Sequence, residues 1–274
     1  MKKVASLRYD VIFKKAFCDV SVFKGFVRDI LGIQLEIDTV ETEKEFAQPV
    51  GRVKPEFDLF AEDKKNRIIV DIQHEKHSDH YDRFLHYHCA AILEQIPNSK
   101  DYKPPLAVYT IVVLTSGDSH KCDVSVIDFD PKKINGQSLG IIKHKMIYIC
   151  PKYMDDNTPP PYREWLRVIN ESLTEQIDES SYCVSEVQKI IAYIKDDEIS
   201  PEERATMIEE YHNEESQIRA LKRAELLTKI SIAKNMQANN LDIKSIASMT
   251  GLSEEHIKKI DDIDIDAFVD QQMN

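Results

Sequence analysis

The feature that most constrains this fold is a run of residues, Leu106–Leu114, that is almost entirely apolar and rich in β-branched side chains. A strand with one exposed face would alternate apolar with polar residues, so this run is typical of a strand buried on both faces. Such a strand needs helices packed on each side of its sheet. The run therefore predicts the central strand of a sheet that is covered by helices.

Other segments supply the elements around this strand. Apolar residues at helical spacing predict a helix over Tyr9–Phe17 and a second helix that ends at Gly32. Loose alternation predicts an edge strand over Leu35–Phe46. The remaining predicted elements are strands at 56–61, 67–73, 122–129 and 146–150, and a helix from Ser78 to about Ile96, stopped by Pro97. The predicted class is α/β (mixed α+β), with a mixed central sheet flanked by helices.

The chain changes character after residue 150. Residues 151–161 include four prolines, which predict a linker or an extended arm lying on the domain. Beyond them the apolar spacing is helical, with expected helices at 162–173, 183–194, 201–239, 243–249 and 253–260, the last capped by Ser253. We therefore expect a domain over 1–150, a linker over 151–161 and an acidic helical region over 162–274.

Charge is distributed unevenly along the chain. The formal net charge of −12 by itself argues against nucleic-acid binding, because phosphate contacts are electrostatic. Residues 1–150 hold 22 basic and 22 acidic side chains, however, and residues 151–274 hold 14 and 26. The first domain is thus neutral overall, and a surface that faces DNA is compatible with the composition.

Several classes of protein are disfavoured. No apolar stretch approaches the roughly 18 residues of a membrane-spanning helix, and no signal-peptide core follows Met1, so a cytoplasmic location without a membrane partner is expected. The five cysteines form no CxxC pair, which argues against a disulfide framework or a zinc knuckle. The seven glycines form neither GxGxxG nor a P-loop, so a nucleotide-binding loop is not expected.

Two aspartates on the predicted hairpin carry the chemistry. Because side chains alternate along a strand, Asp71 and Gln73 project from the same face. A turn that is symmetric about Lys64 and Lys65 pairs residues whose numbers sum to 129, which places Asp58 opposite Asp71. Opposed like charges destabilise a sheet unless a divalent cation lies between them, and oxygen ligands of this kind suit Mg²⁺. The alternative is that both are separate, solvated strand residues.

This pattern resembles a known superfamily. The segments Phe57-Asp58 and Val70-Asp71-Ile72-Gln73 are similar to the Asp…(Asp/Glu)-x-Lys signature of the PD-(D/E)XK nucleases. The chain resembles more narrowly the recombination-promoting nuclease, or transposase-like, branch. The segments that carry this resemblance are Asp10–Phe17, Asp71-x-Gln73, Arg83 with Tyr87, Tyr162–Leu166 and Ile232–Ser253.

The resemblance implies a restriction-endonuclease-like core and DNA cleavage that depends on Mg²⁺ or Mn²⁺. Asp58, Asp71 and the carbonyl oxygen of Ile72 would hold the metal, and Gln73 would stand at the lysine position and orient the attacking water. The residues expected to bind the DNA substrate are Arg83, Tyr87 and Lys14. Gln73 departs from the superfamily pattern, since a neutral amide cannot offset anionic charge as an ammonium does.

Three further features have competing interpretations. Asp10 could add an acidic ligand or could pair with Lys14 at i+4. Five histidines, His74, His77, His80, His86 and His88, crowd before and within the helix, but His86 and His88 diverge on a helix, which argues against a dedicated zinc site. The last two predicted helices imitate a helix-turn-helix, yet Glu254 and Glu255 would lead the recognition helix. Packing, self-association or partner binding is therefore expected instead.

The sequence therefore predicts a metal-dependent DNA endonuclease related to mobile-element proteins. A non-catalytic binding or assembly protein that keeps the nuclease fold is the alternative. A nuclease restrained by its own acidic helical region is a third hypothesis.

Overall fold

The computed structural model describes residues 1–46, 54–74, 80–96, 102–261 and 263–273. Its centre is a six-stranded mixed sheet in the order β2-β3-β4-β5-β7-β6. The bounds along the chain are β2 Glu41–Glu45, β3 Glu56–Glu62, β4 Asn66–Gln73, β5 Ala107–Leu114, β6 Val124–Asp128 and β7 Lys145–Ile149. Strands β4, β5 and β7 are parallel, and the outer strands pair antiparallel. The mixed sheet and the buried central strand β5 are confirmed.

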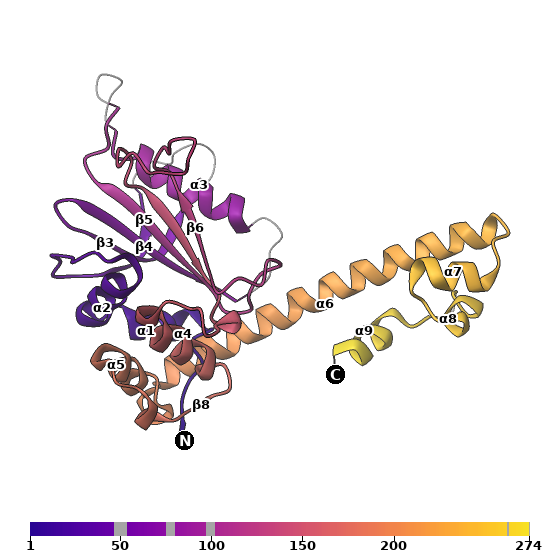
Figure 1. Ribbon diagram of the computed structural model, residues 1–274. Coiled ribbons are helices and arrows are strands. Elements are labelled where there is room, and N and C mark those ends of the chain that lie inside the picture. The colour runs from indigo at the N-terminus through magenta and orange to yellow at the C-terminus, as the bar shows by residue number, and fades with distance from the viewer. Residues whose placement is uncertain (47–53, 75–79, 97–101, 262, 274) are drawn as a thin grey trace. The chain divides into compact units, whose positions relative to one another are not determined.

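Helices cover both faces of this sheet (Figure 1). One face is covered by α1 (Asp10–Phe17), α2 (Val20–Leu31), α4 (Pro160–Ser172) and α5 (Ser185–Tyr193), and is called here the four-helix face. The opposite face is covered by α3 (His80–Leu93) and is called the α3 face. Alternation along β4 and β5 sends Val70 and Ile111 to the four-helix face and Ile69 and Val112 to the α3 face.

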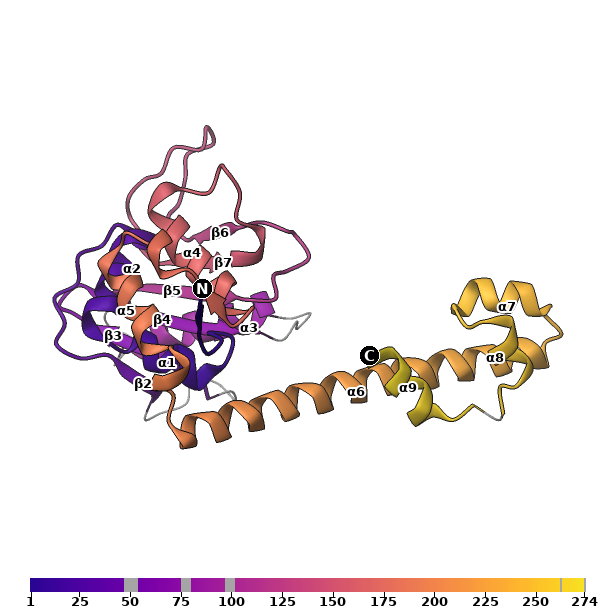
Figure 2. The same cartoon turned by 90° about the horizontal axis from the view of Figure 1, so that it is seen from below.

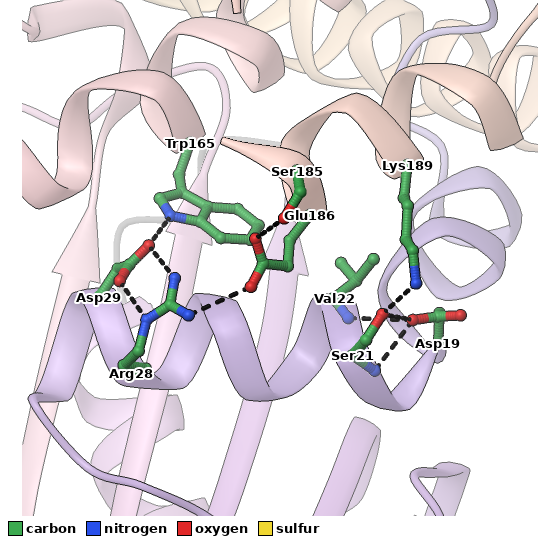
Figure 3. Close-up of polar contacts among 9 residues, drawn as sticks. All are labelled: Asp19, Ser21, Val22, Arg28, Asp29, Trp165, Ser185, Glu186 and Lys189. Atoms are coloured by element: carbon green, nitrogen blue, oxygen red, sulfur yellow. Dashed lines mark hydrogen bonds and ion pairs between the residues drawn. The ribbon is translucent and has the colours of Figure 1, made fainter. Parts of the chain in front are cut away.

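The helices that follow residue 150 belong to the same compact unit as the sheet. Trp165 of α4 is fully buried, and its indole N–H donates to Asp29 Oδ2 on α2 over 2.9 Å (Figure 3). On α5, Glu186 pairs with Arg28 over 3.1 Å. A Cβ placed on Gly25 would lie 2.8 Å from Glu186 Cγ, so α2 and α5 approach closely at this glycine.

The division of the chain accordingly falls later than the boundary predicted at residue 150. The two compact units are Met1–Met207 and Ile208–Asn274, and the division lies within α6 (Pro201–Ala238). The proline-rich segment begins with the short helix η1 (Pro151–Tyr153) and then buries Thr158, whose hydroxyl donates to Asp123 over 2.5 Å. It therefore packs on the domain as an arm. Two short strands, β1 (Lys2–Lys3) and β8 (Gln176–Ile177), pair with each other antiparallel. Two short helices, η2 (Glu179–Ser181) and η3 (Asp196–Glu198), follow β8 along the chain.

The second unit contains the rest of α6 with α7 (Ile243–Thr250), α8 (Glu254–Lys258) and α9 (Ile265–Met273) (Figure 2). Its small core gathers Leu226, Ile230, Ile246, Ile257 and Val269. The Ser253 hydroxyl caps α8 by accepting from the His256 N–H over 3.1 Å, as predicted. The last helix, α9, was not predicted.

Gly32 ends α2 in the left-handed conformation that was expected of it, with φ 69°. The predicted helix start at Ser78 and the stop at Pro97 lie outside the described residues.

No helix in the described part of the chain is long and apolar enough to cross a membrane.

Candidate active site

The hairpin of β3 and β4 pairs in the predicted register. Its four backbone pairs run from Glu62↔Arg67 to Leu59↔Val70, and the residue numbers in each pair sum to 129. The polar turn sets this register: Asp63 accepts from the backbone N–H groups of Lys65 and Asn66 over 2.7 and 2.8 Å. Continued by one step, the same register brings Asp58 and Asp71 opposite each other.

At that step hydrogen bonds from backbone N–H groups to the two carboxylates replace the backbone–backbone hydrogen bonds of the ladder. The Asp58 N–H donates to Asp71 Oδ1 over 3.1 Å, and the Ile72 N–H donates to Asp58 Oδ2 over 2.8 Å. Each aspartate is thus held by the backbone of the opposite strand. Each also keeps one oxygen that the strands do not use.

These remaining oxygens lie in a poorly solvated place. Asp71 is 3% exposed, and its Oδ2 is buried without a hydrogen-bond partner in the described part of the chain. The Asp58 side chain is 23% exposed, and its Oδ1 lies 3.8 Å from Lys14 Nζ. Burial, followed by the charge of Asp58, raises the pKa of Asp71 well above its usual range. Burial, followed by the charge of Asp10, raises the pKa of Asp58 to about 7.

Gln73 lies two residues beyond Asp71 on β4, on the α3 face. It is buried, and among the residues that the structure describes neither its side-chain oxygen nor its side-chain nitrogen has a hydrogen-bond partner. A buried amide without partners is costly, because both its donors and its acceptor have lost water. In a folded protein such a group calls for an explanation, and a catalytic role is one of those known.

Lys14 reaches Asp58 from α1. Its Nζ lies 2.6 Å from Asp10 Oδ2 and 3.3 Å from Glu43 Oε1, in addition to the contact with Asp58. Burial alone would lower the pKa of Lys14, but the hydrogen bond and charge of Asp10 and the charge of Asp58 together raise it. Asp10 thus pairs with Lys14 at i+4, and its charge also acts on Asp58. Its role as a further metal ligand stays a prediction.

Arg83 and Tyr87, four residues apart, lie on one side of α3. The Arg83 guanidinium lies 5.4 Å from the centre of the Tyr87 ring, and that ring meets Phe57 edge-on. Arg83 is exposed, and its positive charge lowers the pKa of both Asp58 and Asp71, although burial has the larger and opposite effect. The fold thus brings the three predicted substrate-binding residues, Lys14, Arg83 and Tyr87, to the surroundings of the two aspartates.

Glu43 was missed by the sequence reasoning. It lies on β2, where the pairs Thr42↔Leu59 and Lys44↔Phe57 flank a gap, so that Glu43 faces Asp58 in register without being paired to it. Its φ of 53° is left-handed, which is uncommon for a non-glycine residue inside a strand. Nothing in the charged segment Glu41–Glu45 signals this conformation. Asp58 therefore lies where the ladders to both neighbouring strands are interrupted.

The donor set suits a hard divalent cation. Two carboxylates and a peptide carbonyl offer oxygen ligands, and the buried Asp71 Oδ2 is an acceptor that such an ion would meet. Among the described residues no group of three or more His, Cys, Asp or Glu side chains is arranged to hold a metal. Mg²⁺ is commonly bound through one or two carboxylates with water and substrate phosphate completing its shell, so a pair is sufficient.

The histidines disperse in the fold. His74 Nδ1 lies 2.7 Å from Thr115 Oγ1, and His88 is buried with Nδ1 2.8 Å from Thr110 Oγ1. His77 lies outside the described residues.

Comparison with known proteins gives a family match. A family model described as PD-(D/E)XK nuclease family transposase matches residues 7–224, which include all of the residues considered above. Searches of the curated proteins and of the solved structures return no significant match. Nucleases of this superfamily generally use divalent metals and act on DNA. The matched region covers most of the chain, and we conclude that the chain belongs to the PD-(D/E)XK nuclease family of transposases.

Proposed function

We propose that this protein is a Mg²⁺-dependent DNA endonuclease that hydrolyses a phosphodiester bond at Asp58 and Asp71. The observation that carries the proposal is the pair of crossed hydrogen bonds that fixes these two carboxylates, 3.1 and 2.8 Å long, together with the buried and unpartnered Asp71 Oδ2. Holding two acidic groups together costs stability, and a dication offsets that cost.

Each residue of the site has a role in this proposal. Asp58, Asp71 and the Ile72 carbonyl would hold the metal, which would supply activation of water and stabilisation of charge on the phosphoryl group. The Gln73 amide, whose polar atoms lack partners, orients the attacking water. Water adds to phosphorus, and the bond to the leaving oxygen breaks, which leaves a phosphomonoester and a hydroxyl end. Arg83, Tyr87 and Lys14 contact the DNA backbone.

The test is nicking of supercoiled plasmid by the full chain in Mg²⁺, in Mn²⁺ and in EDTA. Asp71→Ala should lower the rate by at least about 100-fold, because the metal contributes several kcal/mol to transition-state stabilisation. Asp156→Ala, at an exposed aspartate in the arm, is the matched control and should behave as wild type. Equal rates for wild type and Asp71→Ala would refute the site.

A second function is supported by one observation. Gln73 is neutral, so a nuclease fold that binds partners without cleaving them is compatible with the site. Titration calorimetry with Mn²⁺ separates the two proposals, since a catalytic site requires saturable binding that Asp58→Ala removes.

We also propose a role in recombination of mobile DNA, a location in the cytoplasm and self-association through the helical region. Sedimentation of the full chain at increasing concentration tests the last of these.

A further inference from the structure

The candidate active site gathers more acidic than basic side chains. Asp10, Glu43, Asp58 and Asp71 gather there, and phosphodiester hydrolysis adds further negative charge as the transition state forms. Gln73 cannot offset that charge, because its amide is neutral. Any compensating positive charge from the chain must therefore come from another residue.

Lys14 acts on Asp58, Arg83 acts on both Asp58 and Asp71, and the two cationic side chains differ in burial. Arg83 is exposed, and its guanidinium lies over the Tyr87 ring, so solvent screens much of its charge. The Lys14 side chain is only 13% exposed, and its Nζ lies 3.8 Å from Asp58 Oδ1. A charge held in a poorly solvated place acts more strongly on its neighbours than an exposed one. Lys14 is therefore the better placed of the two.

The surroundings of Lys14 fix its ammonium at this position. Asp10 holds it from one turn earlier on α1, over 2.6 Å, and Glu43 holds it from β2, over 3.3 Å. A lysine has several rotatable bonds and is otherwise free to swing into solvent. Contacts from two separate elements restrict that motion.

Glu43 adopts an unfavourable backbone conformation at this place. Its φ of 53° falls in the left-handed region, and the β2–β3 ladder is interrupted at the same residue. Left-handed backbone at a non-glycine residue costs stability and is often found at functional sites. A glycine would adopt the conformation without that cost.

We infer that Lys14, held by Asp10 and Glu43, supplies to the reacting centre the positive charge that the Gln73 position lacks. The inference rests on the proposed nuclease function and deepens it, because it moves Lys14 from general DNA contact to stabilisation of the charge that develops during hydrolysis. The left-handed backbone of Glu43 serves to hold this ammonium in place.

The first test compares Lys14 variants in single-turnover cleavage at saturating Mg²⁺ and DNA. Lys14→Gln should lower kcat by about 100-fold, as loss of one charge stabiliser does, while the Kd for DNA in Ca²⁺ changes less than about threefold. Lys14→Arg should retain at least a tenth of the rate. Lys15→Gln is the matched control: Lys15 is the next residue on α1, is also ion-paired, to Glu203 over 2.8 Å, and should leave cleavage unchanged.

Moving the positive charge from residue 14 to residue 73 is the decisive experiment. The double variant Lys14→Gln/Gln73→Lys should regain at least about tenfold over Lys14→Gln, since the ammonium returns to the same centre from β4. An unchanged kcat in Lys14→Gln with a weakened DNA Kd would overturn the inference and leave Lys14 as a binding residue. Wild type no faster than Asp71→Ala would instead overturn the nuclease function itself, and the inference with it.

Two readouts do not depend on activity. Mn²⁺ should bind Lys14→Gln at least as tightly as wild type in calorimetry, because the substitution removes a cation that repels the metal. Weaker Mn²⁺ binding would show that Lys14 only positions Asp58, which contradicts the inference. Glu43→Gly should raise the melting temperature, by about 2–4 °C, while cleavage falls. A lowered melting temperature would overturn the role assigned to Glu43.

Discussion

The four-helix face of the sheet is filled by one continuous apolar cluster, whereas the α3 face holds two small apolar clusters with polar side chains between them. Among the described residues, those buried on the α3 face include Arg67, Asp71, Gln73, His88 and Thr110. Burial of polar groups costs free energy unless each finds a partner. The comparison indicates that one face stabilises the domain and that the other can carry polar groups at the cost of stability.

His88 illustrates how the α3 face accommodates such groups. Its ring stacks on Phe129 with the centres 5.0 Å apart, and Nδ1 contacts the Thr110 hydroxyl. Burial, followed by the charge of His144, lowers the pKa of His88 to about 3, so the ring stays neutral. A polar group on this face is thus retained by removing its charge.

The largest effect on stability is expected on the four-helix face. Trp165→Ala should lower the free energy of unfolding by about 3–5 kcal/mol, because it leaves a cavity beside Phe17 and Phe26 and removes the hydrogen bond to Asp29. Urea denaturation measures the loss. Trp165→Phe, which retains an aromatic ring, should cost less. A cost below about 1 kcal/mol for the alanine variant would contradict a dominant role for this face.

A smaller loss in the free energy of unfolding is expected on the α3 face, at Arg67 near the end of α3. Arg67 donates to the Ala91 carbonyl near the end of α3 over 2.7 Å and pairs with Glu94 over 2.9 Å and with Glu62. Arg67→Met should cost about 1.5–3 kcal/mol, since hydrogen bonds to a charged group are lost. Hydrogen exchange should locate the change at the end of α3. Unchanged hydrogen exchange at the end of α3 would contradict the proposal that Arg67 attaches this helix to the sheet.

The aspartate pair predicts a pH dependence of opposite sense to ordinary acid denaturation. The pKa values of Asp58 and Asp71 are raised in the folded protein, so the folded state binds these protons more tightly than the unfolded chain does. The stability from these groups is therefore present at low pH and is lost as the pH rises through about 7, the pKa of Asp58. In EDTA, wild type should lose on the order of 1–3 kcal/mol relative to Asp71→Asn between pH 5 and pH 8.

The quantity to compare is the difference in the free energy of unfolding between wild type and Asp71→Asn at each pH. His88 and His144 have lowered pKa values and act in the opposite direction, but they are common to both proteins and cancel. Thermal unfolding at each pH gives the difference, and Mg²⁺ should remove it at pH 8 by stabilising wild type alone. Parallel melting curves for the two proteins at all pH values would contradict the raised carboxyl pKa values.

Local sequence predicted the elements and the register of the site. The apolar run of β5 predicted that this strand is buried. The turn residues around Asp63 set the hairpin register, in which the numbers of paired residues sum to 129. Both properties depend on neighbours in the sequence. They could be predicted because side-chain alternation and turn chemistry are local.

Properties that depend on distant contacts were not predicted. An amphipathic pattern shows that the helix around Trp165 has an apolar face but not which core that face covers, so the division at Met207 was not foreseen. The left-handed Glu43 follows from the interrupted ladders beside Asp58. For α9, by contrast, the spacing of Ile265, Phe268 and Val269 was a usable signal.

The smallest effect on stability is expected for Gln73, where the two faces can be compared most directly. Its buried amide has no hydrogen-bond partner among the described residues. Gln73→Met, which keeps the volume and removes the polar atoms, should therefore leave the free energy of unfolding unchanged or raise it by up to about 1 kcal/mol. The same change should lower plasmid nicking, because methionine cannot orient water. Ile111→Ala, a truncation at a fully buried position of β5 on the four-helix face, should do the reverse and cost about 2–5 kcal/mol while leaving nicking per folded molecule unchanged. If Gln73→Met destabilised the domain as much as Ile111→Ala does, the amide would have to be a structural group. The proposal that the four-helix face stabilises the domain while the α3 face carries the functional polar groups would then be wrong.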